Sequence, residues 1–318
     1  MKKLVLSVSG GGALGIGPLQ FMKRLEADLN KPLHEICEAY AGTSTGSIIV
    51  SGICKSKSGP GKTASELFDL YKNNLEKIFK KRGVLDLSKA TNYYKYLNSG
   101  LKKMLYEVFP GKMDKFGKPI FIPTTYMNGK STEKVWDRSD DWMDRAFAIL
   151  SSCSAPTYFD SLTLDGQMYC DGGMWANDPI MVLVAGLSRL RKKDREVAKT
   201  FADGFKVLSF NTGMVPPNKG PSNKSILGWL TYIIDEWVAR TGNSNLFEAR
   251  EVIGAENVFR CEPKVSKSYA MDDLKITNDI VKIWDEYYDS YDEEEEKKKK
   301  GKKTVGQKVC QFVKSTME

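Results

Sequence analysis

The sequence predicts an α/β fold built on a mainly parallel central sheet. Two features of the 318-residue chain support this prediction. Short apolar runs such as Leu4–Val8 alternate with longer stretches whose apolar residues recur at helical spacing. Glycine-rich turns at residues 10–17 and 42–46 also join apolar runs to helices. Parallel strands need crossovers of this kind, so the order of elements favours a parallel sheet.

Each element is placed by its hydrophobic spacing. The predicted strands are Leu4–Val8, Ala39–Ala41, 119–127, 133–136, a strand end at Tyr169–Cys170, and Lys206–Phe210. The predicted helices are Pro18–Leu29, Ser47–Ile53, 64–81, 92–109, 142–151 and Asp178–Arg191. The run Ser47–Ile53 is apolar on all sides, which is typical of a buried helix, whereas 64–81 and 92–109 are amphipathic.

The composition limits the function classes. Lysine and arginine number 48 against 40 aspartates and glutamates, and the net charge of +8 favours anionic partners such as phospholipid surfaces or nucleic acid. Six cysteines without a CxxC spacing are typical of reduced thiols rather than disulfides or a metal site. No apolar run approaches a secretion signal or the roughly 20 residues of a membrane span. We therefore expect a soluble, cytoplasmic protein without a bound metal.

A candidate nucleophile lies between the second strand and its helix. The pattern Gly-x-Ser-x-Gly is formed by Gly42, Thr43, Ser44, Thr45 and Gly46. Such a serine sits on a sharp strand-to-helix turn and needs a base to take its proton. The single histidine, His34, precedes Ser44, whereas the α/β-hydrolase order places the histidine after the nucleophile. The base must therefore be another group.

Asp171 is the best-placed carboxylate. It follows a predicted strand and precedes Gly172 and Gly173, which let the backbone turn tightly. Asn177 or Asp178 then caps the next helix. Asp-Gly-Gly alone is typical of a plain turn, so the assignment depends on its combination with the serine motif.

The first glycine-rich turn supplies candidate oxyanion donors. Glycines let the backbone approach a tetrahedral intermediate, and the following helix N-terminus favours negative charge. The candidate N–H groups are those of Gly10, Gly11, Gly12 and Ala13.

Other interpretations remain open. Gly10, Gly12 and Gly15 also satisfy the G-x-G-x-x-G pattern of dinucleotide-binding Rossmann proteins, although no acidic residue is well placed about 20 residues later. A non-catalytic membrane- or partner-binding module on the same fold is a second alternative, and an acyltransferase is a third.

Four segments, in this order, resemble the patatin-like phospholipase family. They are SGGGALG (9–15), GTSTG (42–46), SSCSAPTYF (151–159) and DGGMWANDP (171–179). The resemblance spans about residues 4–215 and implies a three-layer α/β/α fold with Ser44 as nucleophile and Asp171 as general base. It also implies a calcium-independent lipid acyl hydrolase that uses no cofactor. Leu14 departs from the family, in which an arginine often occupies this position.

The resemblance also implies an organisation and a set of partners. We expect a domain over residues 1–290, with a helical lid-like or C-terminal subregion at 216–290, and a charged tail at 291–318. The apolar segment 226–238 is expected to pack in the core rather than touch a membrane. The expected substrate is a phospholipid membrane surface, met peripherally, and no nucleic acid partner is expected. Because the family includes nucleotide-activated bacterial immune effectors, a small-molecule activator and a role in antiviral defence are hypotheses, and a homo-oligomer remains an open alternative.

Overall fold

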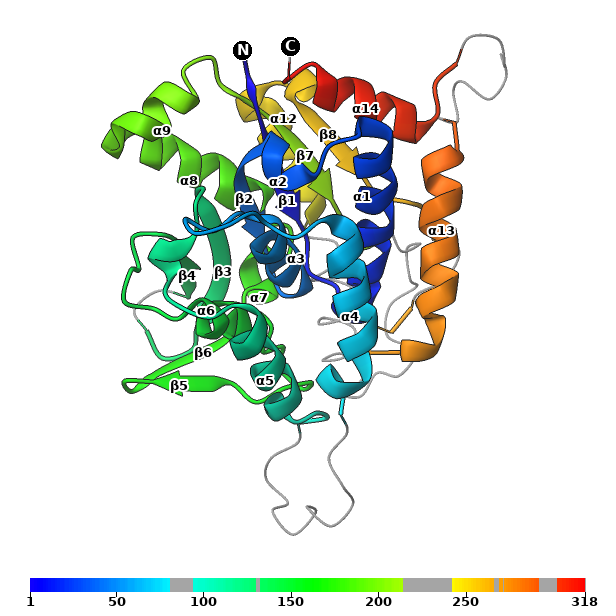
Figure 1. The fold of residues 1–318 in the computed structure, drawn as a ribbon. Helices are drawn as coiled ribbons and strands as arrows, with labels where there is room; N and C mark the ends of the chain where they lie inside the picture. Colours follow the sequence, from blue (N-terminus) through cyan, green and yellow to red (C-terminus); the bar gives the residue numbers. More distant parts are fainter. Residues whose placement is uncertain are drawn as a thin grey trace.

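The computed structural model describes residues 1–80, 94–129, 132–213, 242–265, 269–270, 272–291 and 302–317 (Figure 1). Its strands are β1 (Lys3–Val8), β2 (Cys37–Gly42), β3 (Ile120–Tyr126), β4 (Glu133–Trp136), β5 (Leu162–Leu164), β6 (Gln167–Asp171), β7 (Phe205–Phe210) and β8 (Val258–Cys261). The strand order is β5-β6-β3-β2-β1-β7-β8, with β4 paired to β3. The neighbours from β3 to β8 run parallel, and β4, β5 and β6 form an antiparallel extension.

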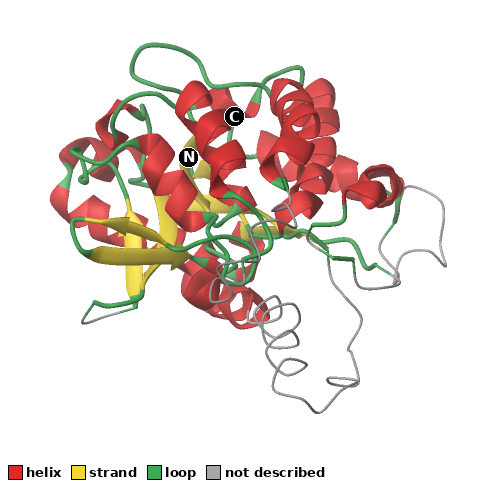
Figure 2. Ribbon diagram, turned by 90° about the horizontal axis from the view of Figure 1, so that it is seen from below, coloured by secondary structure: helices red, strands yellow, loops and turns green. Residues whose placement is uncertain are grey.

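Helices cover both faces of this sheet, as Figures 1 and 2 show. The helices are α1 (Ile16–Leu29), α2 (Leu33–Ile36), α3 (Thr45–Ile53), α4 (Ala64–Ile78), α5 (Asn98–Val108), α6 (Arg145–Ser152), α7 (Gly173–Ala176), α8 (Ile180–Lys193), α9 (Arg195–Thr200), α12 (Gly242–Ile253), α13 (Thr277–Asp289) and α14 (Val305–Lys314). Side chains alternate between the faces of a strand, so Leu4 and Leu6 of β1 pack under the layer that contains α1, α3 and α4. Val5 packs on the opposite face with α8 and α12. The result is the expected three-layer α/β/α arrangement.

The helix boundaries follow from local capping. Thr63 begins α4 because its side chain accepts the N–H of Glu66 at 3.2 Å, while the Glu66 carboxylate accepts the N–H of Thr63 at 2.7 Å. Thr304 and Gln307 form the same reciprocal pair at the start of α14. At the C-terminal end of α1, Asn30 adopts the left-handed backbone conformation that commonly ends a helix.

The helix predicted over 92–109 begins later, at Asn98. The N–H groups of Lys95 and Tyr96 donate to the carbonyls of Thr157 and Tyr158, at 3.0 and 2.8 Å. These bonds hold the chain before Asn98 against a distant segment, so it does not join the helix.

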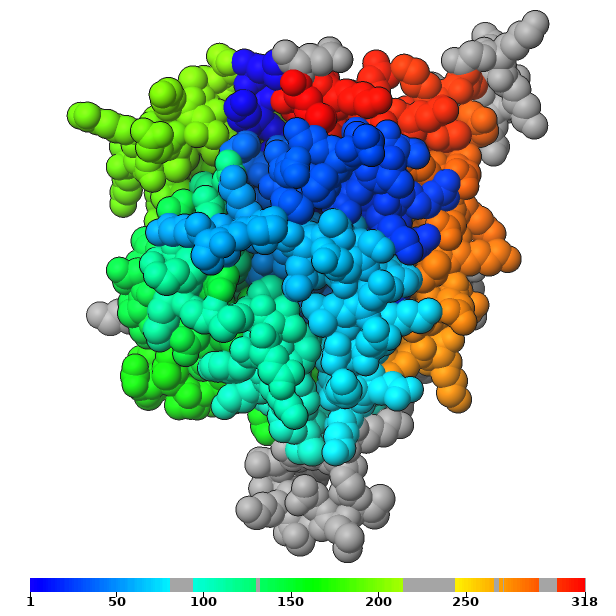
Figure 3. All heavy atoms as spheres, in the orientation of Figure 1, coloured from blue at the N-terminus to red at the C-terminus, as the bar shows by residue number. Residues whose placement is uncertain are grey.

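The C-terminal part differs more from the prediction. Residues 305–314, expected in a charged tail, form α14, in which Val309 and Val313 are fully buried. Figure 3 shows α1, α4 and α13 side by side on one face, with α14 across the upper edge. The subregion 216–290 is not only helical, because β8 extends the central sheet. The segment 226–238 lies outside the described residues.

Among the helices that the structure describes, none combines the length and the apolar character needed to cross a bilayer.

Candidate active site

Ser44 lies on a sharp turn between β2 and α3. Its φ and ψ of 52° and −125° place it in a region that side-chain-bearing residues rarely adopt. The flanking glycines allow the turn to pack closely. A Cβ at Gly46 would lie 2.1 Å from the carbonyl oxygen of Val8, and one at Gly42 would lie 2.3 Å from that of Gly46. The Gly-x-Ser-x-Gly spacing therefore fits α3 directly against the end of β1.

Hydrogen bonds hold the backbone around Ser44. Its N–H donates to Ser152 Oγ at 3.0 Å, and its carbonyl accepts the Ser47 hydroxyl at 2.6 Å. The Thr43 hydroxyl donates to the carbonyl of Ala176 at 2.6 Å, which ties the turn to α7. The position of Ser44 is thus fixed from three sides.

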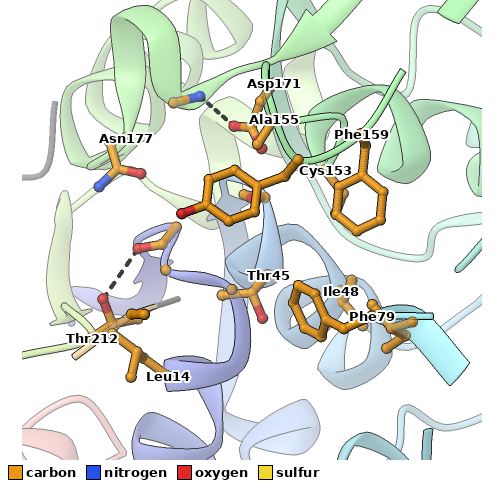
Figure 4. Close-up of a pocket in the computed structure, with 18 of the residues that line it drawn as sticks. Leu14, Thr45, Ile48, Phe79, Cys153, Ala155, Phe159, Asp171, Asn177 and Thr212 are labelled. Atoms are coloured by element: carbon orange, nitrogen blue, oxygen red, sulfur yellow. Dashed lines mark hydrogen bonds between the residues drawn. The ribbon is translucent and has the colours of Figure 1, made fainter. Parts of the chain in front are cut away.

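Asp171 ends β6 and points into the same pocket as Ser44 (Figure 4). Its side chain is only 4% exposed and accepts the N–H of Gly173 at 2.6 Å. Burial raises the pKa of Asp171 to about 7, although hydrogen bonds from Gly173 and the Ser44 hydroxyl act to lower it. A carboxyl group that titrates near neutral pH can both take up and release a proton there.

The glycine loop, residues 9–15, contacts Ser44 and the end of β7, because a Cβ at Gly10 would lie 3.2 Å from Ser44 Cβ and the Ser9 N–H donates to the Phe210 carbonyl at 2.9 Å. The N–H of Gly10 donates to the carbonyl of Asn177 at 3.0 Å, so this group is not the free donor that the sequence predicted. The N–H groups of Gly11, Gly12 and Ala13 have no hydrogen-bond partner among the residues that the structure describes. These three groups remain available to an anion.

The three segments surround a cavity of about 380 Å³, a volume within the range of small-molecule sites. Its polar lining residues include Ser44, Asp171, Asn177, Asn211 and Thr212. Its apolar lining residues include Leu14, Ile48, Ile78, Phe79, Leu101 and Phe159, and Figure 4 shows Ile48, Phe79 and Phe159 on one side of the cavity and Leu14 next to Thr212. This lining fits a molecule with an apolar chain and a polar reacting group.

A family model described as patatin-like phospholipase matches residues 6–184. The chain belongs to the patatin-like phospholipase family. Its class is therefore the lipid acyl hydrolases, and the predicted family, fold and enzyme class are confirmed.

Several named relatives support this assignment. The cUMP-AMP-activated phospholipase of Escherichia coli is 22% identical over 97% of this chain and 92% of its own length. The cGAMP-activated phospholipase of Pseudomonas aeruginosa is 26% identical over 55% of this chain and about half (54%) of its own length. Patatin-like protein 2 of Arabidopsis thaliana is 24% identical over 71% of this chain and 63% of its own length.

The predicted site residues of this patatin-like phospholipase meet at one cavity. Its lining includes Ser44, Asp171, Asn177 and part of the glycine loop, and it does not include His34. Leu14, where the family often has arginine, belongs to the glycine loop and lines the cavity. The family match also favours the acyl hydrolase interpretation over a dinucleotide-binding protein.

Sequence reasoning missed two residues, Ser152 and Arg260, that support the site. Ser152 fixes the Ser44 amide, and its only signal is its place in the segment 151–159. Arg260 of β8 pairs with Asp178 at 2.8 Å, and both side chains are almost fully buried. Asp178 also accepts the N–H of Ile180 at 3.1 Å, but the N-cap residue of α8 is Pro179, not Asn177 or Asp178 as predicted. No sequence pattern indicates the partner from β8, because it lies 82 residues away.

Proposed function

We propose that this patatin-like phospholipase is a calcium-independent phospholipase of the A type, with Ser44 as nucleophile and Asp171 as general base. The observation that carries the proposal is the meeting of a conformationally constrained serine and a buried carboxyl group at one cavity. Since the pKa of Asp171 is raised to about 7, a large fraction of this carboxylate is free to accept a proton at neutral pH.

The reaction proceeds by acyl transfer in two steps. Ser44 Oγ attacks the ester carbonyl carbon, and its proton moves to Asp171. The oxyanion is stabilised by N–H groups of Gly11, Gly12 and Ala13. The ester C–O bond then breaks, and the leaving alcohol takes the proton from Asp171. Water attacks the acyl-enzyme, giving one proton to Asp171, and the fatty acid leaves as Ser44 recovers that proton.

The remaining site residues support this pair. Gly42, Thr43, Thr45 and Gly46 form the nucleophile turn, and Gly172 and Gly173 place the carboxylate. A Cβ at Gly172 would lie 2.2 Å from the carbonyl oxygen of Pro123, so only glycine fits there. The Asn177 carbonyl joins this segment to the glycine loop.

We further propose that a cyclic dinucleotide activates the enzyme and that its substrate is the phospholipid of a membrane surface, met peripherally from the cytoplasm. The names of two relatives state activation by cUMP-AMP and by cGAMP. The first of these aligns with 97% of this chain, which supports the same mode of control here. Membrane degradation in antiviral defence is the corresponding biological role.

We also propose that residues 1–290 form a single domain. The packing of α14 on α1 favours including residues 302–317 in that domain.

The test combines labelling and turnover. The purified protein is treated with a fluorophosphonate and assayed for fatty acid release from phospholipid vesicles, with and without cUMP-AMP or cGAMP. Ser44→Ala should abolish labelling and release, and Asp171→Asn should abolish release. Ser51→Ala is the matched control, because Ser51 lies on α3, the helix that follows Ser44, and its hydroxyl is buried without a partner in the described residues. Labelling that survives in Ser44→Ala would place the nucleophile elsewhere, and full activity without either nucleotide would refute the regulation alone.

A further inference from the structure

Tyr71 of α4 connects the nucleophile turn to the glycine loop. Its side chain is 4% exposed, and its hydroxyl lies 2.5 Å from the carbonyl oxygen of Gly12 and 2.5 Å from Thr45 Oγ1. A carbonyl can only accept, so Tyr71 donates its single proton to Gly12 and accepts that of Thr45. A chain of hydrogen bonds therefore runs from Thr45, next to the nucleophile, through Tyr71 to the glycine loop.

Thr212 holds the same loop from the other side. It follows the end of β7, and its hydroxyl donates to the carbonyl of Gly10 at 3.2 Å (Figure 4). The side chain also packs against Gly11, where a Cβ would lie 2.3 Å from Thr212 Oγ1. Thr212 and Tyr71 thus contact successive parts of the loop from two different elements.

These contacts determine where the loop N–H groups point. In a planar trans peptide, the C=O of one residue and the N–H of the next point in opposite directions. The bond from Thr212 to the Gly10 carbonyl therefore sets the direction of the Gly11 N–H, and the bond from Tyr71 to the Gly12 carbonyl sets that of Ala13. Glycines impose little conformation of their own, so these external bonds add to the short 3-10 turn of Gly12–Gly15, in which the Leu14 N–H donates to the Gly11 carbonyl at 3.1 Å.

We propose that Tyr71 and Thr212 are positioning residues that orient the Gly11 and Ala13 N–H groups for the oxyanion. This inference rests on the proposed function. Both side chains act through the peptide groups of the loop, before substrate arrives, so that donors need no rearrangement as charge develops. Their removal should therefore slow the chemical step and leave substrate binding unchanged.

The first experiment removes the tyrosine hydroxyl alone. Tyr71→Phe should lower kcat by about 10- to 100-fold with little change in KM, because small misplacements of such groups cost up to about 100-fold. Turnover is expressed per active site titrated with fluorophosphonate, so that unfolded protein does not contribute. Tyr40→Phe is the matched control. Tyr40 is fully buried, and its hydroxyl donates to the carbonyl of Cys37 at 3.1 Å, away from the cavity.

The second experiment separates hydrogen bonding from packing at Thr212. Valine keeps the shape of threonine without the hydroxyl, and serine keeps the hydroxyl without the methyl group. Thr212→Val should lose turnover about 10-fold or more, and Thr212→Ser should restore most of that loss. This pair also tests the proposal if Tyr71→Phe fails to fold.

The outcomes distinguish this inference from the proposed function. Absence of Ser44-dependent turnover in the wild-type protein would refute the proposed function itself. With active wild-type protein, unchanged kcat in Tyr71→Phe and Thr212→Val would overturn the positioning role. A greater loss in Thr212→Ser than in Thr212→Val would assign the residue to packing and overturn it as well.

Discussion

Replacing Asp171 by asparagine should make the protein more stable at high pH while removing its activity. The carboxyl titrates at about 7 in the folded protein because of its burial, and an aspartate in an unfolded chain titrates near 4. Each pH unit of this difference corresponds to about 1.4 kcal/mol, so the charged form destabilises the folded state by about 4 kcal/mol. The folded protein holds the proton more tightly, so its stability falls as pH rises from about 4 to 7.

Asparagine is close to isosteric with the protonated acid and carries no charge at any pH. Asp171→Asn should therefore gain up to about 4 kcal/mol over the wild type at pH 8 and little at pH 4.5. At about 2 °C per kcal/mol for a chain of this length, the gain amounts to several degrees in Tm. Urea denaturation and thermal melting of both proteins at the two pH values measure it.

Asp137→Asn provides a control in which the stability at pH 8 should change in the opposite direction. Although burial alone would raise the pKa of Asp137, hydrogen bonds from Ser139 and the ion pair with Arg189 hold it below its usual value. That carboxylate stabilises the fold at neutral pH, so its replacement should destabilise at pH 8. The reasoning about Asp171 is refuted if Asp171→Asn gains nothing at pH 8, or gains equally at both pH values.

Three further predictions concern the same site and its supports. The kcat/KM of the wild type should rise about tenfold between pH 6 and pH 8 as Asp171 loses its proton, and a flat profile would contradict its role as base. Arg260→Met should cost about 3–5 kcal/mol in urea denaturation, because Asp178 would remain buried without its ionic partner; a much smaller loss would show that the pair contributes little. Removal of divalent cations with EDTA should leave vesicle hydrolysis unchanged, since the proposed steps use only groups of the chain; a loss that calcium restores would contradict the mechanism.

The sequence was informative where chemistry depends on local patterns. The apolar runs before the two glycine-rich turns predicted β1 and β2, and the motifs around Ser44 and Asp171 indicated residues that the fold brings to one cavity. A nucleophile turn needs glycines at fixed spacing for steric reasons, so its signal lies within five residues.

The sequence was uninformative where the decisive contact is distant. The start of α5 depends on hydrogen bonds to Thr157 and Tyr158, some 60 residues away. The charge-rich run before α14 obscured the regular apolar face of Val305, Val309 and Val313, which is buried in the fold. The occupied amide of Gly10 could not be foreseen either, because its acceptor belongs to the aspartate segment.

The left-handed backbone at Ser44 has a consequence for the engineering of this fold. Glycine is the residue best suited to a φ of 52° and a ψ of −125°, so a screen that selects only for heat resistance will tend to enrich glycine at position 44. Variants with glycine at this position would retain the cavity and the neighbouring backbone contacts, but they would lack the Ser44 hydroxyl that attacks the ester. Libraries built on this scaffold should therefore be ranked by turnover and melting temperature together.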